Sequence, residues 1–194
     1  MKKLYFIAAL LIGCAAELQT ESISDIEEEI LEPVGIIPDS DCRHIDVGDK
    51  PCNFRLLNHD GEVWDLYSHK GDIIVIDFST MWCGPCQNAG HFAQPLQDEY
   101  DEEGFQFVTI LIDGYMSGIE PTEEEIDEWV VSHEITSSPV LMGSREKMFD
   151  PASIEGYAIS GFPTYIYIDR DMKFYNGHTG FSEEYTKQLI EQGL

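Results

Sequence analysis

Two continuous apolar runs dominate the hydrophobic pattern from about residue 50 onward. The first covers residues 72–78 and follows Gly71, and the second covers residues 105–113. Runs of this length without polar alternation are typical of strands that are buried on both faces. We therefore predict two strands in the middle of a sheet.

Helical spacing follows each of these runs. Apolar residues recur every three or four positions between residues 89 and 100, which predicts a helix facing a core, with a kink at Pro95. In residues 121–134, Thr122 is followed three residues later by Glu125, which is the pattern of a capping box. A second helix is predicted there.

The C-terminal third holds shorter elements. Residues 138–143, 164–169 and 173–180 are candidate strands, and the last two lie close enough in sequence for a hairpin. Ser182 is a suitable cap for a closing helix. Strands alternate with helices and end in a hairpin, so the pattern predicts an α/β sheet with an antiparallel edge.

The first residues have the composition of an export signal. Lys2 and Lys3 precede about ten apolar residues, fewer than the roughly 20 that span a bilayer. The sequence LIGC, which ends at Cys14, resembles the bacterial lipobox, in which this cysteine is lipidated and becomes the new N-terminus. We expect a signal peptide at residues 1–13; a cleaved signal with an incidental cysteine is the alternative.

Lipidation of Cys14 would place the chain on the bacterial cell envelope, anchored by lipid and facing the periplasm. Ala15, in place of aspartate after the cysteine, favours the outer over the inner membrane under the sorting rule of enteric bacteria. Residues 14–46 are acidic and interrupted by Pro33 and Pro38, so we interpret them as a tether. Residues 47–194 would then form the folded domain.

The chain is strongly acidic. It has 37 Asp and Glu against 11 Lys and Arg, a formal charge of −26 over 194 residues. Such a surface repels nucleic acid, which excludes that class of partner. The acidity is typical of a solubilising surface; an acidic docking face for a basic partner is the alternative.

The five cysteines divide into one lipid site and two pairs, because Cys14 is assigned to the lipid. Cys83 and Cys86 form a Cys-x-x-Cys unit where a buried strand meets a helix. Amide groups at a helix N-terminus stabilise a thiolate on the first cysteine, and the second, one turn away, can attack a mixed disulfide. Pro85 suits the first helical turn, and Gly84 permits close approach of a partner backbone.

The segment WCGPC, residues 82–86, matches the thioredoxin active-site motif at every position. Asp77 stands at the position of that family's buried aspartate, and the segment GFPTYIYID resembles the one that carries its cis-proline, here Pro163. Over about residues 47–192 the chain resembles exported, membrane-tethered thioredoxin-like proteins of the TlpA type. The resemblance implies a thioredoxin fold, a central mixed sheet flanked by helices, with an N-terminal extension and a central insertion.

The same resemblance implies roles for individual residues. Cys83 would be the attacking thiolate, Cys86 the resolving thiol, and Asp77 a base that acts on Cys86 through water. The substrate-binding residues implied are Trp82, Gly84, Pro85, Phe162 and Pro163. No cofactor is expected beyond the redox-active disulfide of the two cysteines. A peroxiredoxin pattern is not met, because Ile76 stands where that family's Pro-x-x-x-Thr-x-x-Cys needs proline.

Cys42 and Cys52 precede the first long apolar run. In an oxidising compartment we favour a structural disulfide between them. A second redox pair that relays electrons to Cys83 is one alternative. A zinc site shared with Cys83 and Cys86 is another, but Pro85 between the ligands disfavours it, and we expect no metal.

These features predict a thiol–disulfide oxidoreductase of the bacterial cell envelope. Gly84 and Pro85, by resemblance to thioredoxin, favour reduction of protein disulfides. Such a reductant needs a membrane or periplasmic electron donor. A disulfide oxidant or isomerase, and a non-catalytic adaptor with the same fold, are the alternatives.

Overall fold

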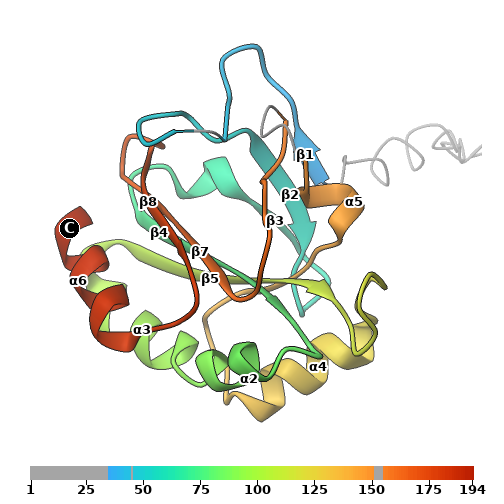
Figure 1. Cartoon of the computed structure of the whole chain (residues 1–194). Coiled ribbons are helices and arrows are strands. Elements are labelled where there is room, and N and C mark those ends of the chain that lie inside the picture. Colours follow the sequence, from blue (N-terminus) through green and yellow to red (C-terminus); the bar gives the residue numbers. More distant parts are fainter. Residues whose placement is uncertain (1–34, 45, 151–154) are drawn as a thin grey trace, which may run out of the picture. The chain divides into compact units, whose positions relative to one another are not determined.

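The computed structural model describes residues 35–44, 46–150 and 155–194 (Figure 1). The predicted signal peptide, Cys14 and most of the predicted tether lie outside the described residues. Within the described ranges, none of the helices has the length and apolar character that spanning a bilayer requires.

A five-stranded mixed sheet forms the centre of the domain, in the order β6-β5-β4-β7-β8. The first three strands in this order are parallel to one another, β7 pairs antiparallel with β4, and β8 pairs antiparallel with β7, so the sheet has the antiparallel edge that the sequence pattern predicted. The strands are β4 (Ile73–Thr80), β5 (Phe105–Asp113), β6 (Val140–Met142), β7 (Thr164–Ile168) and β8 (Phe174–Thr179).

β4 is the central strand because it can bury both of its faces. All eight of its residues are buried. Ile76 stands opposite Val108 of β5 on one side and Ile166 of β7 on the other. The two strands predicted from continuous apolar runs are confirmed, and the site cysteines follow directly after the more central one.

The predicted helix with a kink at Pro95 is wrong in detail, because the structure has two helices there. They are α2 (Gly84–Gly90) and α3 (Ala93–Tyr100). A proline ring collides with the carbonyl group four residues earlier, which here belongs to His91. α2 therefore ends at Gly90, before His91. Pro95 falls in the first turn of α3, where the backbone amide has no partner within the helix and none is required.

The capping box of the next helix, α4 (Glu123–Ser132), is present as predicted. The Glu125 amide donates to Thr122 Oγ1 over 3.3 Å, and the Thr122 amide donates to Glu125 Oε2 over 2.7 Å. Ile126 and Trp129 turn their side chains into the core. The closing helix α6 (Glu183–Gly193) is capped by Ser182, also as predicted.

A second, three-stranded antiparallel sheet was not predicted. It consists of β1 (Gly35–Ile37), β2 (Asn53–Leu57) and β3 (Val63–Asp65). Because β1 pairs with β2, the folded domain begins before the expected boundary at residue 47 and includes part of the predicted tether. A three-residue strand carries too few side chains to produce a recognisable alternation.

Two clusters of buried side chains hold the layers together, one on each face of the central sheet. Leu96, Trp129 and Leu189 belong to the cluster on the helical side. Phe54 and Leu56 of β2 belong to the other. Figure 1 shows α2, α3 and α4 below the central sheet, and β1 and β2 above it. A short helix, α5 (Arg145–Met148), follows β6 and was also missed.

Candidate active site

Cys83 and Cys86 are joined by a disulfide at the start of α2, with their Cα atoms 5.2 Å apart. Cys83 is the N-cap residue of the helix, and the Cys86 amide donates to Cys83 Sγ over 3.2 Å. Cys83 is 5% exposed and Cys86 is fully buried. The sulfur that accepts the helical amide is therefore also the one nearer to solvent.

The turn between β4 and α2 is fixed from both sides. The Met81 amide donates to the Asp113 carbonyl at the end of β5, over 3.1 Å. Gln87 Nε2 donates to the Met81 carbonyl over 2.9 Å. Gly84 and Pro85, between the cysteines, are exposed, and Pro85 occupies the first turn of α2. The disulfide is thus held on a turn that hydrogen bonds fix from both sides, and the residues between its two cysteines are open to solvent.

A segment distant in sequence completes the surroundings of Cys83. The Phe162–Pro163 peptide bond is cis, and Pro163 is buried directly before β7. The Phe162 carbonyl oxygen lies 3.6 Å from Cys83 Sγ. A main-chain carbonyl group of this segment therefore faces the more exposed of the two sulfurs.

Trp82 covers the side of the site toward β5. Its side chain is 44% exposed, and its ring packs edge-to-face against Phe162, with centroids 6.0 Å apart. Trp82 Nε1 donates to Asp113 Oδ2 over 3.1 Å. The indole is thus oriented by a hydrogen bond as well as by packing.

Asp113 is itself held by Arg145 of α5, a pair that the sequence reasoning missed. Arg145 donates to both carboxylate oxygens, over 2.9 Å and 2.6 Å. Burial disfavours the charge on Asp113, but hydrogen bonds from Arg145, Gly118 and Trp82 outweigh it and lower the pKa of this carboxyl. The position of Asp113 at the end of a buried strand was a usable signal, whereas nothing in the sequence indicated Arg145.

Asp77 of β4 is completely buried. Burial raises the pKa of its carboxyl to about 7, and hydrogen bonding by Ser79 and Tyr165 opposes that rise. Ser79 Oγ donates to Asp77 Oδ1 over 2.8 Å. A carboxyl with this pKa can take up and release a proton near neutral pH.

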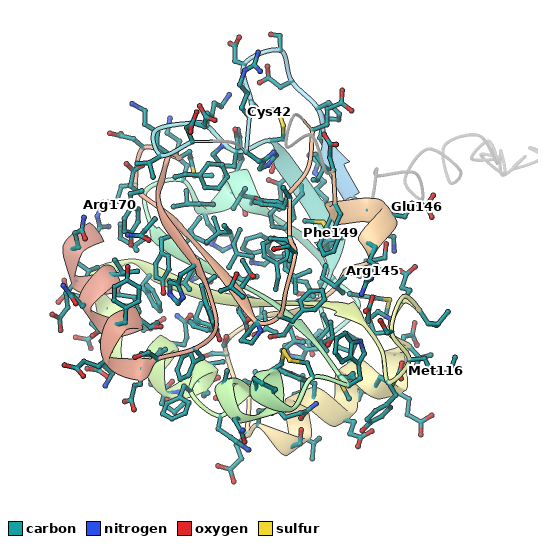
Figure 2. All side chains as sticks on the ribbon, in the orientation of Figure 1. Cys42, Met116, Arg145, Glu146, Phe149 and Arg170 are labelled. Carbon is teal, nitrogen blue, oxygen red and sulfur yellow. A yellow bond between two sulfur atoms is a disulfide. The ribbon has the colours of Figure 1, made fainter. Side chains whose placement is uncertain are left out.

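Cys42 and Cys52 form the second disulfide, with their Cα atoms 4.7 Å apart. Both residues are buried, and the bridge links the segment after β1 to the start of β2. Figure 2 shows Cys42 near the top of the view, whereas α2 lies near the bottom in the same orientation (Figure 1). The two disulfides do not share a site, so the structure gives no support to an electron relay or to a four-cysteine zinc centre.

Metal-ligating side chains do not gather elsewhere in the described ranges either. Among the residues that the structure places, no group of three or more His, Cys, Asp or Glu side chains is arranged to hold an ion.

The central mixed sheet, the Cys-x-x-Cys turn at the start of α2 and the cis-proline opposite it define a thioredoxin-like protein. The model of the AhpC/TSA family matches residues 47–173. The chain belongs to this family.

Named relatives and solved structures agree with this class. The thiol-disulfide oxidoreductase ResA of Bacillus cereus is 24% identical over 152 residues, which cover 78% of this chain and 79% of the relative. A putative thiol:disulfide interchange protein DsbE from Chlorobium tepidum is 27% identical, with a TM-score of 0.59, over 76% of this chain and 95% of that one. A putative thiol-disulfide oxidoreductase from Bacteroides vulgatus is 25% identical, with a TM-score of 0.60, over 77% and 97%.

Proposed function

We propose that the chain is a thiol–disulfide oxidoreductase of the bacterial cell envelope that reduces protein disulfides through Cys83 and Cys86. The observation that carries this proposal is the disulfide at the N-terminus of α2, with the Phe162 carbonyl oxygen 3.6 Å from Cys83 Sγ. Relatives over three quarters of the chain bear the name of this activity.

The reaction begins with the reduced dithiol. The Cys83 thiolate, stabilised by amides at the start of α2, attacks one sulfur of the substrate disulfide. A bond forms between Cys83 Sγ and that sulfur, and the other substrate sulfur leaves as a thiolate that takes a proton from solvent. The product is a mixed disulfide between enzyme and substrate.

The second step releases the substrate. Cys86 gives its proton, through water, to the Asp77 carboxylate, and its thiolate attacks Cys83 Sγ. The Cys83–Cys86 disulfide forms, the mixed disulfide breaks, and the second substrate sulfur leaves as a thiolate. Two electrons pass from the dithiol to the substrate, so a membrane or periplasmic donor has to reduce the enzyme again. No cofactor takes part in either step.

The surroundings of Cys83 suit an extended protein segment. The main chain at Phe162 and Pro163 faces the sulfur, where it can pair with a substrate strand. Trp82 provides a flat apolar contact beside it, and the exposed Gly84 and Pro85 leave room for a backbone.

Trapping of substrates tests this function. In Cys86→Ser the second step cannot occur, so mixed disulfides between Cys83 and envelope proteins should accumulate. They are detected as bands that disappear with dithiothreitol on non-reducing gels, and mass spectrometry identifies the attached proteins. Cys83→Ser is the matched control, because it keeps one thiol but lacks the attacking one. Equal bands in both variants, or none in either, would refute the proposal.

The reduction potential of the Cys83–Cys86 pair tests whether the protein reduces or oxidises its substrates. A value near the roughly −120 mV of a strong disulfide oxidant would replace reduction by oxidation or isomerisation, whereas values near about −270 mV are typical of a reductant.

We also propose that Cys14 carries a lipid that anchors the domain to the envelope, facing the periplasm and in the outer rather than the inner membrane. The support is the LIGC sequence after a short apolar segment and the Ala15 that follows it. Cys14→Ala should move the protein from the membrane fraction to the soluble fraction after cell lysis. If the variant sediments with membranes as fully as the parent, the anchor is not at Cys14.

A further inference from the structure

A row of three polar side chains crosses the central sheet. Asp77 of β4 stands opposite Thr109 of β5 and Tyr165 of β7. Register partners on neighbouring strands project from the same face of a sheet. All three residues are fully buried, and Tyr165 belongs to the same cluster of buried side chains as Cys86. The row therefore lies on the face that α2 covers.

Each member of this row has an oxygen that forms no well-directed hydrogen bond within the described residues, although the Tyr165 hydroxyl lies close enough to Asp77 to lower the pKa of its carboxyl. The three oxygens are Asp77 Oδ2, Thr109 Oγ1 and Tyr165 Oη. The other oxygen of the carboxylate, Asp77 Oδ1, accepts a hydrogen bond from Ser79 Oγ. Buried polar groups rarely stay unpaired, and three of them in adjacent positions can satisfy one another directly or through one buried water.

The Tyr165 hydroxyl is suited to donate a hydrogen bond to the Asp77 carboxylate. Burial, and then the charge of Asp77, raise the pKa of the Tyr165 phenol far above its ordinary value. The phenol therefore keeps its proton at any working pH and can only support the carboxylate, not act as a base itself. A neutral donor favours the ionised form of its acceptor.

None of the other described groups near Asp77 carries a positive charge that would favour its ionised form. Ser79 belongs to β4 itself, Cys86 of α2 belongs to the cluster of buried side chains on this side of the sheet, and Tyr167 is the next residue of β7 on the same face. His178 of β8 stacks on the Tyr165 ring, and its pKa is lowered by burial, so it is neutral at neutral pH. No cation of the described chain contributes to the pKa of Asp77.

We propose that Tyr165 is a positioning residue for the resolving step: its hydroxyl, together with that of Thr109, hydrogen-bonds the free Oδ2 of Asp77 and keeps this carboxylate ionised and oriented to take the Cys86 proton. The inference rests on the proposed function. In the balanced step, the proton passes from Cys86 Sγ to Asp77 while the Cys83–Cys86 bond forms and the bond to the substrate sulfur breaks.

Tyr165→Phe tests the role, because it removes the hydroxyl and keeps the ring. A mixed disulfide between Cys83 and a chromogenic thiol is prepared, and release of the thiol by Cys86 is followed in single turnover from pH 5 to 9. Loss of the donor should move the midpoint of this pH profile upward by about one unit, which is a tenfold change in proton affinity. Below the midpoint the release should slow by a similar factor.

Tyr167→Phe is the matched control, since its hydroxyl contacts His178 and Thr186 rather than Asp77. This variant should keep the wild-type midpoint. Thr109→Val should shift the midpoint in the same direction as Tyr165→Phe, which preserves the test if one variant folds poorly. Equal midpoints in wild type, Tyr165→Phe and Thr109→Val would overturn the inference.

The carboxyl itself gives a readout that does not depend on activity. Carbon-13 NMR of reduced protein reports the titration of Asp77 directly, and its midpoint should rise in Tyr165→Phe. If wild type releases the thiol normally but the carboxyl titrates alike in both proteins, only the role of Tyr165 fails. If wild type fails to release the thiol, the proposed function fails instead.

Discussion

Replacing Cys83 by serine should reduce the catalysed reduction of insulin by dithiothreitol to the rate without protein, a loss on the order of a thousandfold or more. Cys83 Sγ accepts a hydrogen bond from the Cys86 amide and lies 3.6 Å from the Phe162 carbonyl oxygen, where we propose that a substrate strand binds. A serine hydroxyl is not ionised there, so it does not attack a disulfide. Turbidity of the released insulin chains gives the rate.

The double variant Cys42→Ser and Cys52→Ser is the control for this loss. It also removes a disulfide, but one that lies at the opposite end of the domain from α2. Its rate should stay near that of wild type at a temperature where both are folded. A loss as large as that of Cys83→Ser would instead support an electron relay through Cys42 and Cys52. Equal rates in wild type and Cys83→Ser would support a non-catalytic adaptor.

The central sheet was predictable because its strands differ most from the rest of the chain. β4 and β5 bury nearly every side chain, and continuous apolar runs of that length are typical of strands with both faces covered. The small sheet left no such signal. β1 and β3 have three residues each, and their pairing depends on main-chain hydrogen bonds that any sequence can make.

Some residues of the candidate site could likewise be predicted from the sequence, and others could not. Cys83 and Cys86 could be found because a local motif determines their geometry, and Asp77 and Pro163 because they resemble positions in a known family. The orientation of Trp82 depends on Asp113, which lies 31 residues away, and on Arg145, which lies 32 residues beyond that. Contacts at such separations form only when strands and helices pack, so a single sequence does not reveal them.

Asp77 also shows how the function opposes the stability of the fold. A carboxyl in the middle of a central strand has no charged partner among the described residues, and its ionisation is disfavoured by burial. A neutral side chain of the same size would fit the core better. The proposed base for Cys86 is therefore retained at a cost in the free energy of unfolding.

The cost of burying Asp77, measured as a loss in the free energy of unfolding, depends on pH. The pKa of Asp77 is about 7 in the folded protein against an ordinary value of 3.8. Below pH 3.8 both states hold the proton and Asp77 contributes nothing. Between these pKa values the unfolded chain ionises first, so stability falls as the pH rises, and it levels off above pH 7 with a total loss of at most about 4 kcal/mol.

Asp77→Asn removes this titration, so the variant should be more stable than wild type, and its advantage should grow by about 2 kcal/mol between pH 5.5 and 8.5. Urea unfolding of both oxidised proteins at the two pH values measures the free energies.

Asp171→Asn, at an exposed position between β7 and β8, is the charge-matched control and should show no such growth. The same Asp77→Asn protein should release substrate from the mixed disulfide more slowly, because it lacks the carboxylate that we propose as the base. An advantage that is equal at both pH values would mean that the Asp77 carboxyl is not strongly perturbed in the folded protein, and its assignment as the base for Cys86 would fail with it.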